Sequence, residues 1–62
     1  MKFVMEIECD NAAFEEAPGH ELARIIETAA VRVREGVHWG KLRDINGNQV
    51  GRFDIVGSKP GT

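Results

Sequence analysis

Hydrophobic and polar residues alternate along residues 2–9, near the beginning of the chain. One side would carry Phe3, Met5, Ile7 and Cys9, and the other side would carry Lys2, Val4, Glu6 and Glu8. A period of two is typical of a half-buried strand. We predict that Cys9 is a small buried side chain and not a reactive thiol, because the adjacent Glu8 and Asp10 disfavour a thiolate.

A helical pattern runs from about Pro18 to Glu35, with apolar residues three and four positions apart. This stripe contains Leu22, Ile25, Ile26, Ala29 and Val33. Pro18 suits a first helical turn, and Gly36 suits the position just past the last turn. The spacing also allows Glu21–Arg24 and Arg24–Glu27 pairs. Val31 lies off the stripe, so we expect it to be exposed or to touch a partner.

The segment before this helix favours a turn, because Asp10 and Asn11 side chains bond to nearby backbone N–H groups. Phe14 is the only large apolar residue there, and we expect it to tuck under the edge of the helix.

After Gly36 the pattern indicates two strands, residues 37–44 and 49–56, joined around Asn46-Gly47. Asn-Gly is a strong hairpin signal, because both residues tolerate the positive φ of a type I′ turn. With such an even loop, Leu42 faces Gly51 and Gly40 faces Phe53. Leu42, Phe53 and Ile55 then share one side.

An odd loop is chemically as well suited, with Asp44 beginning a type I turn and Gly47 in a bulge. It would place Leu42 opposite Val50 and Trp39 opposite Phe53. A slip of one residue turns every side chain to the other face. We favour the even register, because it keeps more aliphatic bulk together.

These elements predict an α+β fold of the order β-α-β-β, with residues 1–56 as one domain and residues 57–62 as a flexible tail. A right-handed crossover makes the first two strands parallel. The last strand then lies between them, which gives the order 1-3-2, with the helix packed on one face of the sheet.

Composition narrows the function classes. The 62 residues carry 8 Lys+Arg against 10 Asp+Glu, a formal net charge of -2, which argues against an electrostatic nucleic-acid binder. The sequence contains no apolar run long enough for a membrane span, and its beginning lacks the apolar centre of a signal peptide. A cytoplasmic location is therefore the expectation.

Stability must come from packing, because the single Cys9 excludes an internal disulfide. A chain this short buries a limited core, and oligomerisation is a common remedy. A homodimer is therefore a possible state.

No enzyme signature is present, and we assign no residue to catalysis, to a cofactor or to a metal. His38 near Asp54 lacks a nucleophile or an orienting third group. Asp44, Asn46 and Asn48 resemble a calcium loop, but Gln49 and Ile55 occupy the positions that require Gly and Glu. We interpret this segment as a turn.

The sheet face away from the helix would have no cover within the chain. The residues predicted to form an interaction surface there are Trp39, Lys41, Arg43, Val50, Arg52 and Val56. Trp39 suits an anchor for a protein partner, a stacking platform for single-stranded nucleic acid, or a side chain that caps the edge of the core or stacks on an arginine. Glu6, Glu8 and Asp54 on the same face disfavour phosphate, so a protein partner is the main hypothesis.

Two segments carry a resemblance to a family. The chain resembles small uncharacterised proteins encoded by bacteriophages and prophages, through Asn11-Ala12-Ala13-Phe14 and the hairpin from Leu42 to Phe53, which includes Asp44-Ile45-Asn46-Gly47-Asn48-Gln49-Val50-Gly51. The resemblance spans nearly residues 1–56 and implies a fold more than an activity. It also implies a small accessory protein that acts on a host protein.

Overall fold

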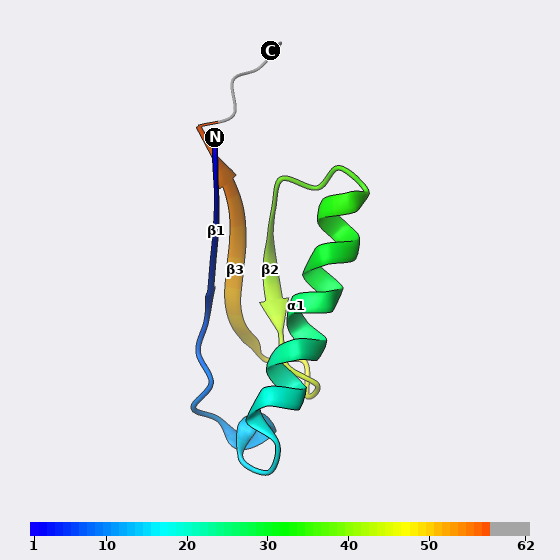
Figure 1. Ribbon diagram of the computed structural model, residues 1–62. Helices are drawn as coiled ribbons and strands as arrows, with labels where there is room; N and C mark the ends of the chain where they lie inside the picture. The colour runs from blue at the N-terminus through cyan, green and yellow to red at the C-terminus, as the bar shows by residue number, and fades with distance from the viewer. Residues whose placement is uncertain (58–62) are drawn as a thin grey trace.

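The computed structural model describes residues 1–57, and its elements follow the order predicted from the sequence (Figure 1). They are strand β1 (Lys2–Ile7), the 3-10 turn η1 (Ala12–Phe14), helix α1 (Pro18–Arg34), strand β2 (Trp39–Arg43) and strand β3 (Gln49–Val56). The predicted tail lies outside the described residues except for Gly57.

The three strands form one sheet of order β1-β3-β2, so the predicted strand order and α+β class are confirmed. Strand β3 is antiparallel to both neighbours, which leaves β1 and β2 parallel, as the crossover rule requires.

Helix α1 begins and ends where its sequence signals predict. Pro18 occupies its first turn, where a backbone N–H is not needed. At the other end Gly36 has a φ of 96°, and its N–H donates to Val33 O. The N–H of Val37 donates to Arg32 O at 3.0 Å. These two bonds form a Schellman motif, which ends the helix and returns Val37 towards the core.

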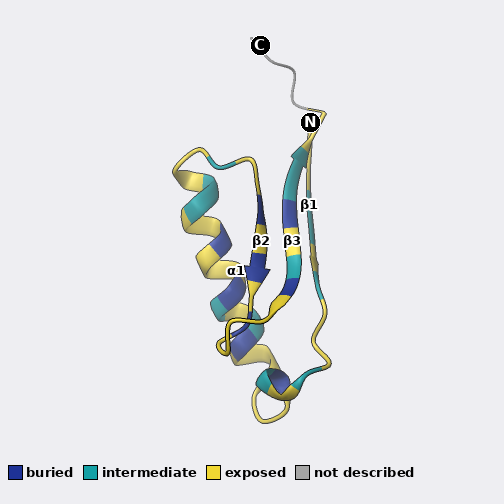
Figure 2. Cartoon of the chain, turned by 180° about the vertical axis from the view of Figure 1, so that it is seen from behind, coloured by how far each residue is buried: buried dark blue, intermediate teal, exposed yellow. Residues whose placement is uncertain are grey.

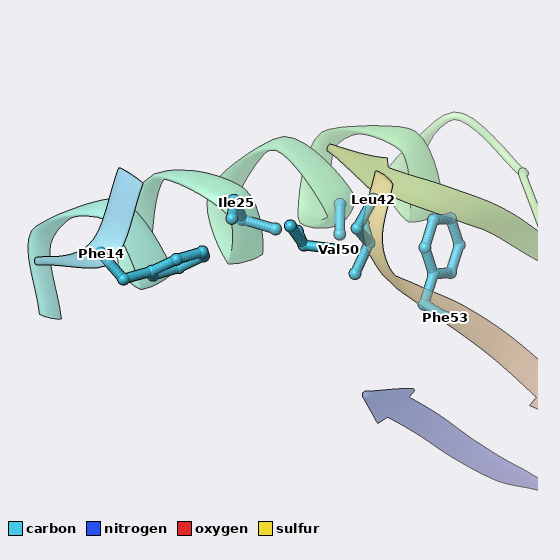
Figure 3. Packing of buried hydrophobic residues seen from close by; sticks show 6 residues of the cluster. Phe14, Ile25, Leu42, Val50 and Phe53 are labelled. Carbon is cyan, nitrogen blue, oxygen red and sulfur yellow. The ribbon is translucent and has the colours of Figure 1, made fainter. Parts of the chain in front are cut away.

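The helix lies beside β2, and the core fills the space between α1 and the strands β2 and β3 (Figures 1 and 3). The buried cluster consists of Phe14, Ile25, Ala29, Leu42, Val50 and Phe53. Met5 and Ile7 of β1 pack against its margin, whereas Phe3 remains 50% exposed. Figure 2 shows the same asymmetry, with buried positions on α1, β2 and β3 and none on β1. The helix therefore covers only part of one sheet face.

The hairpin combines the two registers that the sequence allowed. Its loop is odd: Asp44 N–H donates to Asn48 O, Gly47 N–H donates to Asp44 O, and Gly47 has a φ of 86°. No other residue of this loop has a positive φ, so the type I′ expectation is wrong. A bulge between Leu42 and Arg43 then restores the even register, with Leu42 opposite Gly51.

The bulge changes which side chains reach the core. Because it adds one residue to β3, both Val50 and Phe53 face the helix, although a regular strand would place them on opposite faces. The predicted placement of Leu42 and Phe53 on one side is correct, and both are buried.

Cys9 is exposed, so its prediction as a buried side chain is wrong. The β1–β3 pairing ends at Ile7 opposite Gly51, with a last bond from Glu8 N–H to Val50 O. Cys9 lies beyond this end, where the period of two no longer determines burial.

Candidate functional site

The sheet face opposite α1 carries two mixed rows of side chains across the three strands. Residues that pair directly in an antiparallel sheet project to the same face. One row is therefore Trp39, Asp54 and Val4, and the other is Lys41, Arg52 and Glu6. Lys2 and Val56 pair near the end of the sheet. We call these eight residues the open face.

Trp39 is the most prominent apolar side chain of the open face. It is the first residue of β2 and is 67% exposed. A small depression beside it is lined by Trp39, Lys41, Arg52 and Asp54, among others. The interpretation of Trp39 as a cap on the core edge is therefore wrong, because the indole stands largely in solvent.

The open face carries charges of both signs, with Lys41 and Arg52 as neighbours and Glu6 beside Arg52. Arg52 forms an ion pair with Glu6 at 3.1 Å, and both side chains are more than half exposed. Asp54 lies opposite Trp39 on the neighbouring strand. Arg43, on the same side of β2, donates to Gly47 O in the hairpin loop at 3.2 Å. The arrangement resembles a polar protein-binding surface more than a continuous basic track.

The structure places five of the six predicted surface residues on this side of the sheet. Trp39, Lys41, Arg43 and Arg52 are exposed, and Val56 is 36% exposed. Val50 does not belong to the surface. It is 7% exposed and packs in the core, because the bulge turns it towards the helix.

A groove runs along the outer edge of β2, on the other side of Trp39. Four cationic residues from two elements are among those that line it: Arg24, Arg32, Lys41 and Arg43. Arg32 donates to Lys41 O at 2.9 Å and lies over the Phe53 ring, 5.2 Å from its centroid. Arg24 donates to Arg43 O at 3.4 Å. The two helix arginines thus bond to carbonyls on the outer edge of the strand.

Two buried carboxylates hold the hairpin loop against the rest of the chain. Glu21 and Asp44 are 6% and 4% exposed. Glu21 accepts two hydrogen bonds from Arg24, at 2.8 and 2.9 Å, and one from the Ile45 N–H at 2.8 Å. The helix is thereby tied directly to the hairpin loop.

Asp44 is the centre of the hairpin loop. Its carboxylate accepts from the backbone N–H groups of Asn46 and Asn48, both at 2.9 Å, and from the side chain of Asn11 at 2.7 Å. Asn11 also accepts from Ala13 N–H and so begins η1. The interpretation of the Asp-x-Asn-x-Asn segment as a turn is confirmed by these bonds.

Both carboxyls ionise more readily than usual. Hydrogen bonds from Arg24 lower the pKa of Glu21 against the opposing effect of burial. Burial alone would raise the pKa of Asp44, but the hydrogen bonds from Asn48, Asn11 and Asn46 outweigh it, and the pKa lies below its ordinary value. A general acid needs a raised pKa, so this pair suits structure and not proton transfer.

The other candidate chemistry is not assembled in residues 1–57. Strand pairing sets Asp54 opposite Trp39 and not opposite His38, whose carbonyl accepts from Ile55 N–H. No group of three or more His, Cys, Asp or Glu side chains is placed there to hold a metal ion. In the same range, no helix has both the length and the apolar character to cross a membrane.

Sequence reasoning missed the buried role of Glu21 and the cationic groove. Glu21 reads as a polar helix residue with an i,i+3 partner, and only the tertiary contact with the loop at Ile45 explains its burial. Arg24 and Arg32 are eight positions apart and lie on one helix face. This spacing could have predicted that both contact the same strand, as they do in β2.

Comparison of the chain with protein-family models, with curated proteins and with solved structures gave no match.

Proposed function

We propose that this protein is a non-enzymatic interaction module that binds another protein through the open face. The observation that carries the proposal is Trp39, a large aromatic side chain that is 67% exposed on a sheet face that no helix of residues 1–57 covers. Tryptophan and arginine are enriched among the residues that dominate binding energy at protein interfaces.

The chemistry around Trp39 supports a protein ligand. Val4 and Val56 are partly exposed and extend the apolar area, while Lys41, Arg52, Glu6 and Asp54 supply both signs of charge. Mixed charges around an aromatic centre match the polar rim and apolar middle of a non-obligate interface. A partner with complementary charges would exclude water from the indole.

The test compares two single variants that each remove one exposed hydrophobic side chain. Trp39→Ala alters the open face, and Ile45→Ala is the control, because Ile45 is 69% exposed but lies in the hairpin loop. A chain encoded by a phage, as the resemblance implies, would have its partner in the host cell, so tagged chains are incubated with bacterial lysate. We expect a protein that wild type and Ile45→Ala retain and Trp39→Ala loses.

Crosslinking then identifies the surface of this chain that the retained protein contacts. Crosslinks from Lys2 and Lys41, which lie on the open face, support the proposal. A partner that Trp39→Ala retains as well as wild type does contradicts it.

The cationic groove supports a second candidate, a weak single-stranded nucleic-acid binder. Trp39 belongs to the open face and also lines this groove, so stacking of a base on it would combine with phosphate contacts to Lys41 and Arg43. An oligonucleotide should then quench Trp39 fluorescence at low salt, and added salt should reverse the effect. Unchanged fluorescence at low salt excludes this candidate.

A further inference from the structure

The two edges of the sheet differ in whether other parts of the chain bond to their backbone. On the outer edge of β2, the carbonyls of Lys41 and Arg43 accept hydrogen bonds from the helix arginines Arg32 and Arg24. Strand β1 has β3 as its only neighbour in the sheet, and no element of residues 1–57 runs along its other side (Figure 1). An unpaired strand edge is a template for pairing with another chain.

The direction of the free backbone groups on β1 follows from one hydrogen bond. Glu8 N–H donates to Val50 O of β3. Because hydrogen-bonded positions alternate along an antiparallel pair, Glu6, Val4 and Lys2 also direct their backbone groups towards β3. The N–H and C=O groups of Phe3, Met5 and Ile7 therefore point away from the sheet, along its free edge.

The side chains of this edge remain partly apolar and uncovered. Phe3 is 50% exposed although it stacks on Phe53 with ring centroids 6.1 Å apart, and Met1 is 93% exposed. The edge contains neither a proline nor a bulge that would block pairing, since the pairing of β1 with β3 is regular. A strand with these properties gains both backbone bonds and apolar burial from a partner strand.

The sequence of β1 is complementary to itself in one antiparallel register. A two-fold axis perpendicular to the sheet keeps each face on its own side, so odd residues must oppose odd residues and even residues must oppose even ones. With Val4 on the axis, the pairs are Met1 with Ile7, Lys2 with Glu6, Phe3 with Met5, and Val4 with its own copy. Every apolar residue then meets an apolar one, and every charge meets its opposite.

The neighbouring register is less favourable. With Met5 on the axis, Val4 would oppose Glu6, so an apolar side chain would meet a charged one. The first register also lets Phe3 and Met5 exchange both of their outward backbone hydrogen bonds.

We propose that β1 pairs with β1 of a second copy of this chain, antiparallel and centred on Val4, to form a continuous six-stranded sheet. Both helices lie on the same face of that sheet, above the two β2 strands. The open faces lie together on the other side, so self-pairing leaves Trp39 accessible. The inference goes beyond the proposed function, because it rests on the free backbone edge of β1. The Lys2–Glu6 and Val4–Val4 pairs lie at the β1 side of the open face, two strands away from Trp39.

The test is a charge exchange at the predicted pair of Lys2 and Glu6, measured by sedimentation velocity on the full chain. Wild type should move from the 6.9 kDa monomer towards twice that mass as its concentration rises. Lys2→Glu or Glu6→Lys alone creates two like-charge pairs, and we expect the dissociation constant to rise about tenfold. An equimolar mixture of the two variants should dimerise as wild type does, because each chain then complements the other.

The control variants separate this proposal from other modes of association. Lys41→Glu and Trp39→Ala alter the open face and should leave the dimer unchanged. Four results would overturn the proposal: a wild-type monomer up to millimolar concentration, a mixture that stays monomeric, rescue of Lys2→Glu by Glu8→Lys in place of Glu6→Lys, or loss of the dimer in Trp39→Ala.

Discussion

At the scale of single residues, two glycines have a role because their neighbours occupy the space of a side chain. A Cβ at Gly40 would lie 2.8 Å from an edge atom of the Phe53 ring and would collide with the Arg32 guanidinium. A Cβ at Gly51 would collide with the carbonyl oxygen of Glu6 and lie 2.9 Å from Ile7 Cα. At Gly40 the space of the missing side chain is taken by other side chains, among them the flexible Arg32. At Gly51 it is taken by the backbone of β1, which cannot move aside without breaking the sheet.

Gly51→Ala should accordingly be the most damaging small substitution in the sheet. Overpacking against fixed backbone typically costs about 1–3 kcal/mol, and we expect the upper end of that range, since the obstacle is a carbonyl group. The measurement is the free energy of unfolding in urea. Gly19→Ala is the matched control, because nothing lies within 4 Å of its Cβ, and it should stabilise the helix slightly. Equal stability of the two variants would contradict the packing at Gly51.

The carboxylates of Glu21 and Asp44 make stability depend on pH. Their pKa values are lowered in the folded chain, so their contribution is full above the ordinary values of 4.5 and 3.8 and is lost as the pH falls through the lower folded values. Thermal unfolding followed by circular dichroism should show a midpoint that falls through this acidic range. The fall should be clearly smaller in Asp44→Asn and unchanged in Glu16→Gln, whose carboxylate is exposed. If the midpoint falls equally in wild type, Asp44→Asn and Glu16→Gln, the hydrogen bonds of the Asp44 carboxylate do not cause the acid sensitivity.

At the scale of elements, the hairpin shows why a register cannot be assigned from its turn alone. The Asp44–Gly47 segment forms an odd loop, while the packing of Leu42 and Phe53 requires the even register. The bulge reconciles the two by adding one residue at Val50, next to the point where β1 approaches Gly51. Bulges re-aim side chains, and this one moves a valine from the open face into the core.

The buried position of Val50 can be tested with a matched pair of substitutions. Val→Thr preserves the shape of the side chain and adds a hydroxyl group. At Val50, with 7% exposure, a hydroxyl without a partner should cost about 1–3 kcal/mol of unfolding free energy. The same change at Val56 should stay within about 0.5 kcal/mol, because that side chain reaches solvent. If Val50→Thr is as stable as Val56→Thr, the burial of Val50 is contradicted.

The elements themselves were predictable because their signals are local. Pro18 and Gly36 mark the helix, and the alternation of Phe3, Met5 and Ile7 marks the first strand. The errors concern side chains whose burial depends on tertiary contacts. Cys9 follows the alternation but lies beyond the last strand pair, and Glu21 is buried only because a loop remote in sequence supplies the Ile45 N–H.

At the scale of the whole molecule, one helix does not cover a three-stranded sheet. Alpha-helix α1 lies beside β2, where its arginines occupy the strand edge, and this position leaves β1 at the uncovered side (Figures 1 and 2). The strand order and the existence of an open face followed from sequence rules on chirality and alternation. The lateral position of the helix did not, because it depends on how Arg24, Arg32 and Gly40 fit together.

The proposed pairing of two copies through β1 rests on this asymmetry, because the helix arginines occupy only the β2 edge of the sheet. Amide hydrogen exchange, followed by NMR at increasing protein concentration, tests it most directly. At low concentration the N–H groups of Val4 and Glu6 should be protected, while those of Phe3 and Met5 exchange freely. At high concentration Phe3 and Met5 should become protected as well. Exchange at Phe3 and Met5 that is equally fast, or equally slow, at every concentration would exclude self-pairing through β1.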